Sequence, residues 1–230
     1  MAPLRVLCIH GYRQNSGSFR EKTGALRKLL KKHVELVFMD APLCVKPPEA
    51  PGTPQTCEGT PGTPQSSEVS PDQDPRGWWF SDVAARSFSA QQRCEVSLGL
   101  DQSVAAVRDA VKTLGPFDGV LGFSQGAAFV AMLCALQEQN LEPEFGFRFA
   151  VLVAGFRSAC SEHERFYERV LEIPTLHVFG LDDRVIPDHM SKDLLPVFKE
   201  PLTLTHPGGH FIPAAAAHRQ TYQDFLKRFQ

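Results

Sequence analysis

The chain has 230 residues, of which 43% are hydrophobic and 22% are charged, and its formal net charge is -2 at pH 7. This composition is typical of a globular protein, and the length suits one larger domain over 1–230. The charge offers no basic surface for a phosphate backbone, so we expect no nucleic-acid partner. No apolar stretch approaches the ~20 residues of a transmembrane helix, and no secretory leader is evident. We therefore expect a cytoplasmic protein, with nuclear presence allowed.

The six cysteines and eight histidines are scattered along the chain. None of them form the Cys-x-x-Cys or His-x-x-His spacings that are typical of zinc sites. Without a secretory leader we expect the thiols to stay reduced, several of them as small core residues. The sequence therefore predicts neither a metal site nor a cofactor.

Short β-branched or apolar runs alternate with longer amphipathic stretches along the chain. In chain order, this pattern predicts strands at 4–10, 34–40, 117–123, 149–154, 175–180 and 202–206, and helices at about 18–32, 97–114, 125–140, 160–171, 190–199 and 214–229. Such alternation predicts an α/β fold with a six-stranded, mainly parallel sheet and helices on both faces.

Residues 46–75 interrupt this alternation with a segment rich in Pro, Gly and Thr, in which Pro-Gly-Thr-Pro-Gln occurs twice. Such a segment buries too little apolar area to offset the entropy of ordering it. We predict a disordered insertion within the domain.

The segment Gly122-Phe123-Ser124-Gln125-Gly126 lies between an apolar run and a helical stretch. It matches the nucleophile elbow, in which a serine on a tight strand-to-helix turn raises its hydroxyl above the sheet. The glycines allow the strand and the helix to approach each other closely. The alternative is an ordinary turn in which the serine caps the helix. We predict that Ser124 is a catalytic nucleophile.

A catalytic serine needs a histidine base and an acid that orients this base, and in the elbow architecture they follow the serine as acid, then histidine. His210 comes after two glycines beyond the last predicted strand, where a flexible loop brings it over Ser124. His206 is the alternative base. Asp182 and Asp183 both stand where the fifth strand meets its loop, and the residues alone do not separate them.

Five segments of the chain together resemble one family: Ile-His-Gly-Tyr-Arg-Gln-Asn at 9–15, Gly-Trp-Trp-Phe at 77–80, the elbow at 122–126, Gly-Leu-Asp-Asp-Arg-Val-Ile-Pro at 180–187 and Gly-Gly-His-Phe-Ile-Pro at 208–213. The whole chain outside the insertion is similar to the serine hydrolase family of the ovarian-cancer-associated esterase, within the α/β-hydrolases. The resemblance implies the α/β-hydrolase fold and a Ser-His-Asp triad whose acid falls on Asp183. It also implies medium- to long-chain alkyl esters as substrates.

Acyl transfer also requires two backbone N–H groups that stabilise the oxyanion of the tetrahedral intermediate. Gln125, the residue after the nucleophile, is expected to supply one. With the strand order 2-1-3-4-5-6, the first and third strands are neighbours, and the loop after the first strand then supplies the other from Tyr12. His10, at the rim of the first strand, is expected to hold this loop rather than to act as a base.

Three aromatic residues are candidates for the wall of an acyl pocket: Trp79, Phe156 and Phe211. For the aromatic run 78–80 the alternative is plain packing of the returning chain against the sheet edge.

These residues together predict a serine carboxylesterase that hydrolyses a small-molecule acyl ester through an acyl-enzyme. An acyl-protein thioesterase or a lysophospholipase is the enzyme alternative, because the same elbow and triad serve those reactions. A non-catalytic binding module on a hydrolase fold is the alternative of another class. No protein partner is predicted.

Overall fold

The computed structural model describes residues 2–46 and 73–230, so most of the predicted insertion lies outside the described residues. Six strands form the main sheet in the order β2-β1-β5-β6-β7-β8, and every neighbouring pair is parallel. Their bounds are β1 (Leu4–Ile9), β2 (Val34–Met39), β5 (Gly119–Phe123), β6 (Phe149–Val153), β7 (Thr175–Gly180) and β8 (Leu202–His206). The predicted strands and their order 2-1-3-4-5-6 are confirmed.

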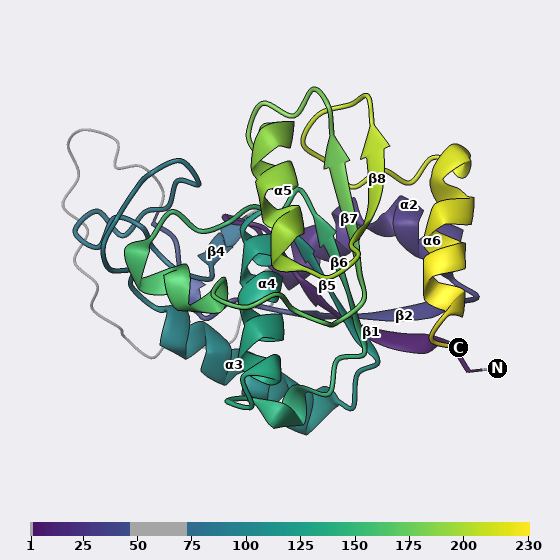
Figure 1. The fold of residues 1–230 in the computed structure, drawn as a ribbon, viewed down its shortest axis with the longest axis horizontal. Helices are drawn as coiled ribbons and strands as arrows, with labels where there is room; N and C mark the ends of the chain where they lie inside the picture. The colour runs from purple at the N-terminus through teal and green to yellow at the C-terminus, as the bar shows by residue number, and fades with distance from the viewer. Residues whose placement is uncertain (1, 47–72) are drawn as a thin grey trace, which may run out of the picture.

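Helices cover both faces of this sheet (Figure 1). On one side lie α2 (Gly24–Leu30) and α6 (Arg219–Lys227), and on the other lie α3 (Leu100–Leu114), α4 (Gln125–Glu138) and α5 (Asp188–Leu194). In the described parts of the chain, no helix has the length and apolar character needed to cross a membrane.

The predicted helices at 18–32 and 160–171 differ most from the structure. The stretch at 18–32 forms α1 (Ser16–Lys22) and α2, because α1 begins at an Asn15 capping box and ends at Thr23, whose hydroxyl donates back to the Phe19 carbonyl at 2.9 Å. The stretch at 160–171 forms only a 3-10 helix, Ser161–Phe166. Its first N–H groups donate to the carbonyls of Cys94 and Glu95 instead, which ties this segment to a distant one.

A small antiparallel pair, β3 (Leu43–Cys44) and β4 (Arg76–Gly77), stands on either side of residues 47–72. Arg76 also pairs with Gln14, in the loop that follows β1. This pairing returns the chain to the sheet, so that Trp78, Trp79 and Phe80 enter the interior and are almost completely buried.

The three central strands and helix α4 form the apolar core of the molecule. Every residue of β5, β6 and β7 is buried, as expected for parallel strands that are covered on both faces. In α4, all residues from Gln125 to Leu136 are buried, so this helix shows no polar face. It therefore runs through the core, and its first turn is fixed from several directions.

Glycine at 126 lets α4 lie directly against β1. A Cβ atom there would lie 2.3 Å from the carbonyl oxygens of both Ile9 and His10, and one on Gly122 would lie 2.4 Å from the Gly126 carbonyl oxygen. These contacts are with backbone, which cannot rotate away. The contact between α4 and the end of β1 therefore requires glycine at 126, and the tight turn from β5 into α4 requires glycine at 122.

We predict that Gly126→Ala lowers the free energy of unfolding by about 3 kcal/mol, because overpacking against backbone forces the strand and helix apart. Gly24→Ala is the matched control: its nearest neighbour is the Arg27 side chain at 3.8 Å, and it opens helix α2. This change is expected to leave stability unchanged or raise it by about 0.5 kcal/mol. Urea unfolding of both variants measures the difference. Equal stabilities would contradict the close-approach argument.

Candidate active site

Ser124 lies at the turn between β5 and α4 with the backbone angles φ 56 and ψ -119. A non-glycine residue with positive φ is strained, and such strain persists only where the surroundings enforce it. Here the Ser124 N–H donates to the Val153 carbonyl at 2.9 Å, and the Ser124 carbonyl accepts from Ala127 and Ala128. The turn has the geometry of the predicted nucleophile elbow.

His210 and Asp183 form a hydrogen-bonded pair. The Nδ1 atom of His210 lies 2.7 Å from Asp183 Oδ2, and the Asp183 side chain is fully buried. The other carboxylate oxygen, Oδ1, accepts from the backbone N–H groups of Val185 and Ile186, both at 2.9 Å. The carboxylate is therefore fixed, and it can hold the imidazole with Nε2 free for chemistry.

Asp182 lies outside this arrangement. Its side chain is 69% exposed and is 3.8 Å from the Arg184 guanidinium. Of these two neighbouring aspartates, Asp183 is therefore the one whose side chain contacts His210.

The loops after β7 and β8 are joined by backbone hydrogen bonds, and this places His210 beside Asp183. Leu181 N–H donates to the His206 carbonyl at 2.8 Å, and Asp182 N–H donates to the Gly208 carbonyl at 3.1 Å. His206 itself is buried at the strand end, where its Nδ1 accepts from the Gly208 N–H at 3.2 Å. His206 is therefore a structural part of the joint between these two loops.

The loop after β1 is held by His10. This fully buried imidazole lies with Nδ1 2.8 Å from the Gly11 carbonyl, and Nε2 accepts from the Ala41 N–H at 3.0 Å. Because a backbone N–H is always the donor, Nε2 carries no proton, and Nδ1 donates to Gly11. Burial lowers the pKa of His10 to about 4, so the ring is neutral at pH 7.

The Gly11 carbonyl that His10 fixes belongs to the peptide whose N–H is that of Tyr12. In a trans peptide the C=O and the N–H point in opposite directions, so the Tyr12 N–H faces away from His10. Within residues 2–46 and 73–230 this N–H donates to no protein acceptor, whereas those of Gly11, Arg13 and Gln14 all do. Its orientation is therefore set, and it is available to a ligand.

The side chain of Gln125 makes two structural contacts that the sequence did not reveal. Its side chain accepts from the Trp78 N–H at 3.0 Å and donates to the Trp79 carbonyl at 2.8 Å. Trp78 also donates from Nε1 to the His10 carbonyl at 2.7 Å and stacks on Phe129 of α4. The segment after β4 is thus attached both to the elbow and to the end of β1.

A cavity of about 710 Å³ opens at this edge of the sheet and brings Ser124 and His210 together with Tyr12. Most of its wall is apolar or uncharged, and the residues that line it are Gly11, Tyr12, Arg13, Gln14, Phe19, Lys22, Phe88, Ser89, Ala90, Gln91, Phe123, Ser124, Val185, Ile186, His210, Phe211 and Ile212. The size and character are those of a small-molecule site.

The predicted acyl wall is corrected by this cavity. Phe211 lines it, but Trp79 and Phe156 lie one layer further in, almost completely buried. Phe88 separates them from the cavity, with its ring 5.1 Å from that of Trp79 and 6.0 Å from that of Phe156. The positions of Trp78 and Trp79 fit the alternative, in which the returning chain packs against the sheet. Burying an indole contributes at most about 5 kcal/mol of hydrophobic free energy.

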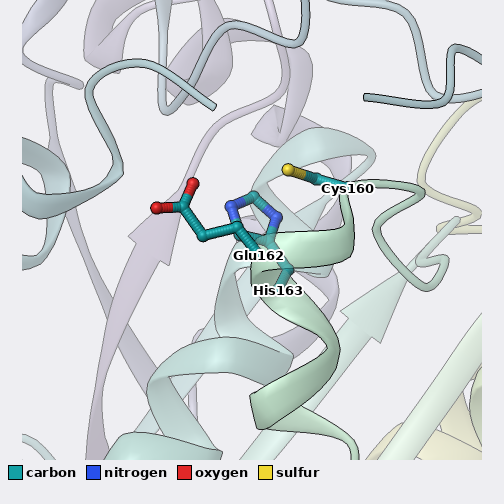
Figure 2. Close-up of side chains that lie close together, drawn as sticks. All are labelled: Cys160, Glu162 and His163. Atoms are coloured by element: carbon teal, nitrogen blue, oxygen red, sulfur yellow. The ribbon is translucent and has the colours of Figure 1, made fainter. Parts of the chain in front are cut away.

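Figure 2 shows Cys160, Glu162 and His163, the one group in the described part of the chain whose ligand atoms lie close enough for a metal, within 4.8 Å of one another. Each of these atoms already has a protein partner. His163 binds the hydroxyls of Ser158 at 2.6 Å and Ser97 at 2.8 Å, and Glu162 accepts from the Ser97 N–H. The Cys160 thiol donates to a backbone carbonyl. This cluster is a satisfied hydrogen-bond network.

The sheet order, the elbow and the loop histidine together define the class of α/β-hydrolases. Solved structures share this fold: maize acyl-protein thioesterase 2 matches with a TM-score of 0.61 at 17% identity, over 98% of this chain and 95% of that one.

A family model described as "Serine hydrolase (FSH1)" matches residues 1–222. The zebrafish Esterase OVCA2 is 68% identical over 99% of this chain and 98% of its own length, and the human Esterase OVCA2 is 47% identical over 99% and 97%. The chain belongs to the FSH1 family of serine hydrolases.

Proposed function

We propose that the protein is a carboxylesterase in which Ser124 is the nucleophile, His210 the general base and Asp183 the residue that orients the base. The observation that carries the proposal is the hydrogen bond between His210 and the buried Asp183, above the same cavity as the strained Ser124. Relatives named esterases along the full chain support it.

In this reaction Ser124 Oγ attacks the ester carbonyl as His210 Nε2 takes its proton. The negative charge that develops on the carbonyl oxygen is stabilised by the N–H groups of Tyr12 and Gln125. The alcohol leaves with the proton from Nε2, and an acyl-enzyme remains. Water then attacks the acyl group, with His210 again as base, and the free acid and Ser124 are regenerated.

The environment of Asp183 suits its role. Two backbone N–H groups hold one carboxylate oxygen, so the second oxygen cannot turn away from the imidazole. The pair thereby selects the tautomer in which His210 Nδ1 is protonated and Nε2 is the base.

We infer a substrate with a medium- to long-chain acyl or alkyl group. Phe88, Phe123, Ile212 and Phe211 supply an apolar surface next to Ser124 in a cavity of about 710 Å³. Burying methylene groups there contributes up to ~0.8 kcal/mol each.

Replacing the nucleophile tests the proposal. Ser124→Ala is expected to abolish labelling by a fluorophosphonate probe and to lower kcat on p-nitrophenyl esters by about 10⁴-fold or more, because no other group forms the acyl-enzyme. Ser161→Ala, at an exposed serine outside the cavity, is the control and is expected to retain full labelling. Normal turnover by Ser124→Ala would end the esterase proposal.

Substitutions at the neighbouring residues Asp183 and Asp182 test which aspartate orients the base. Asp183→Asn is expected to lower kcat by about 10⁴-fold, because an amide presents the wrong hydrogen-bond partner to Nδ1. Asp182→Asn changes an exposed side chain and is expected to change kcat less than about two-fold. Steady-state kinetics on one ester measures both. If the two effects were reversed, the acid role would belong to Asp182.

Acyl-chain selectivity tests the cavity wall. For p-nitrophenyl esters from acetate to myristate, kcat/KM is expected to rise by up to about four-fold per buried methylene and then to level off. Phe211→Ala should flatten this rise, whereas Leu202→Ala should not, although the two side chains are similarly exposed (49% and 44%). A profile that is highest for acetate would contradict the long-chain inference. Faster turnover of matched thioesters would favour the thioesterase alternative.

A further inference from the structure

Two basic side chains, Arg13 and Lys22, are the charged groups that line the cavity around Ser124. No carboxylate of the described residues lines it with them, since Asp183 is buried behind His210. The chain as a whole carries a net charge of -2. The cavity therefore has a local charge opposite in sign to that of the protein.

Neither cation is neutralised within the described part of the protein. The Arg13 guanidinium lies 5.7 Å from the centre of the Tyr12 ring, and it and the Lys22 ammonium form no ion pair or side-chain hydrogen bond there. By contrast, Arg76, in the strand beside the same loop, pairs with Asp74 at 2.9 Å.

Arg13 is also held in an unfavourable backbone conformation. Its φ is 68, in the left-handed region where glycine or asparagine would be less strained. The loop enforces this conformation, because the Arg13 N–H donates to the Arg76 carbonyl at 2.8 Å and Gln14 pairs with Arg76. Strained residues of this kind concentrate at ligand sites.

We propose that Arg13 and Lys22 form an anion subsite, which selects esters that carry a carboxylate or a phosphate in addition to an apolar chain. The inference rests on the proposed esterase function and specifies its substrate class. Arg13 directly follows Tyr12, the proposed oxyanion donor. The loop that fixes the Tyr12 N–H therefore fixes the backbone of Arg13 as well. Lys22 approaches from the end of α1.

The subsite acts on binding rather than on the chemical step. The charge of the anionic group does not change during acyl transfer. The two cations therefore stabilise the bound ground state and the transition state equally. The expected signature is a lower KM for anionic esters with little change in kcat. Because the cations are exposed, the preference should decline as salt is added.

The test compares esters of equal acyl-chain length, one of which carries an anionic group. One series uses mono-p-nitrophenyl esters of dicarboxylic acids from succinate to sebacate. Each is compared with the neutral diester in which the free carboxylate is methylated and the p-nitrophenyl group is kept. A second pair compares dodecanoyl glycerol phosphate with monododecanoylglycerol. We expect the anionic member of at least one set to have the higher kcat/KM at low salt. The set that responds distinguishes a carboxylate on the acyl side from a phosphate on the alcohol side.

Charge-removing variants assign the effect to residues. Arg13→Gln and Lys22→Gln should each lower the anionic-to-neutral ratio of kcat/KM by about three- to five-fold, and the double variant by about ten-fold or more, the scale of exposed ion pairs. Arg20→Gln is the control, since it removes the same charge from the same last turn of α1 outside the cavity. It should leave the ratio unchanged.

A wild-type ratio of one or below in both sets, or a ratio that the double variant retains, would overturn the subsite. Failure of the esterase proposal looks different, because neutral esters would then also remain intact. In that case calorimetry of Ser124→Ala with suberate monomethyl ester against dimethyl suberate decides the subsite. Tighter binding of the charged probe, lost in the double variant, supports it, and equal binding overturns it.

Discussion

Helix α4 meets strand β1 at the bare backbone of Gly126, and the catalytic edge of the sheet is organised around this contact. The absence of a side chain allows the first turn of the helix to lie against the carbonyls of Ile9 and His10. Ser124 and Gln125 at the start of the helix are thereby placed next to the loop that carries Tyr12. Both proposed oxyanion donors thus come together because two segments more than a hundred residues apart touch without side chains between them.

Buried hydrogen bonds then fix what this contact brings together. His10 orients the Gly11–Tyr12 peptide, and the Gln125 side chain binds the backbone of Trp78 and Trp79. These groups are neutral and buried, so the bonds are not weakened by water or salt. An oxyanion site must be preorganised to lower the barrier, and this network would hold the proposed donors in place.

The cavity combines two kinds of wall, which we propose bind different parts of a substrate. Aromatic and aliphatic side chains such as Phe88 and Phe211 suit an acyl chain, while Arg13 and Lys22 offer positive charge without a protein counter-ion among the described residues. The tryptophans behind Phe88 support this wall from the core. Under these proposals, substrate choice depends on loops at the edge of the sheet, which can vary without disturbing the proposed triad.

Much of the arrangement was predictable because its signals are local. Alternating strands and helices predicted the α/β fold, and the elbow around Ser124 can be recognised as a short motif of five consecutive residues. His210 was placed by the glycines that precede it. The helices at 18–32 and 160–171 were less predictable, since α1 ends at Thr23 and the second stretch forms only a short 3-10 helix whose start is bound to Cys94 and Glu95.

The sequence by itself thus determined the fold class and the candidate nucleophile and base, and through the family resemblance it placed the candidate acid at Asp183. Tertiary structure alone decided that Asp183 and not Asp182 turns inward, that Phe88 and not Trp79 or Phe156 faces the cavity, and that Arg13 and Lys22 share it. The physical reason is that periodicity and motifs report a residue's immediate neighbours. The direction of a loop side chain and the layer in which an aromatic ring lies depend on packing between segments that are distant in the chain.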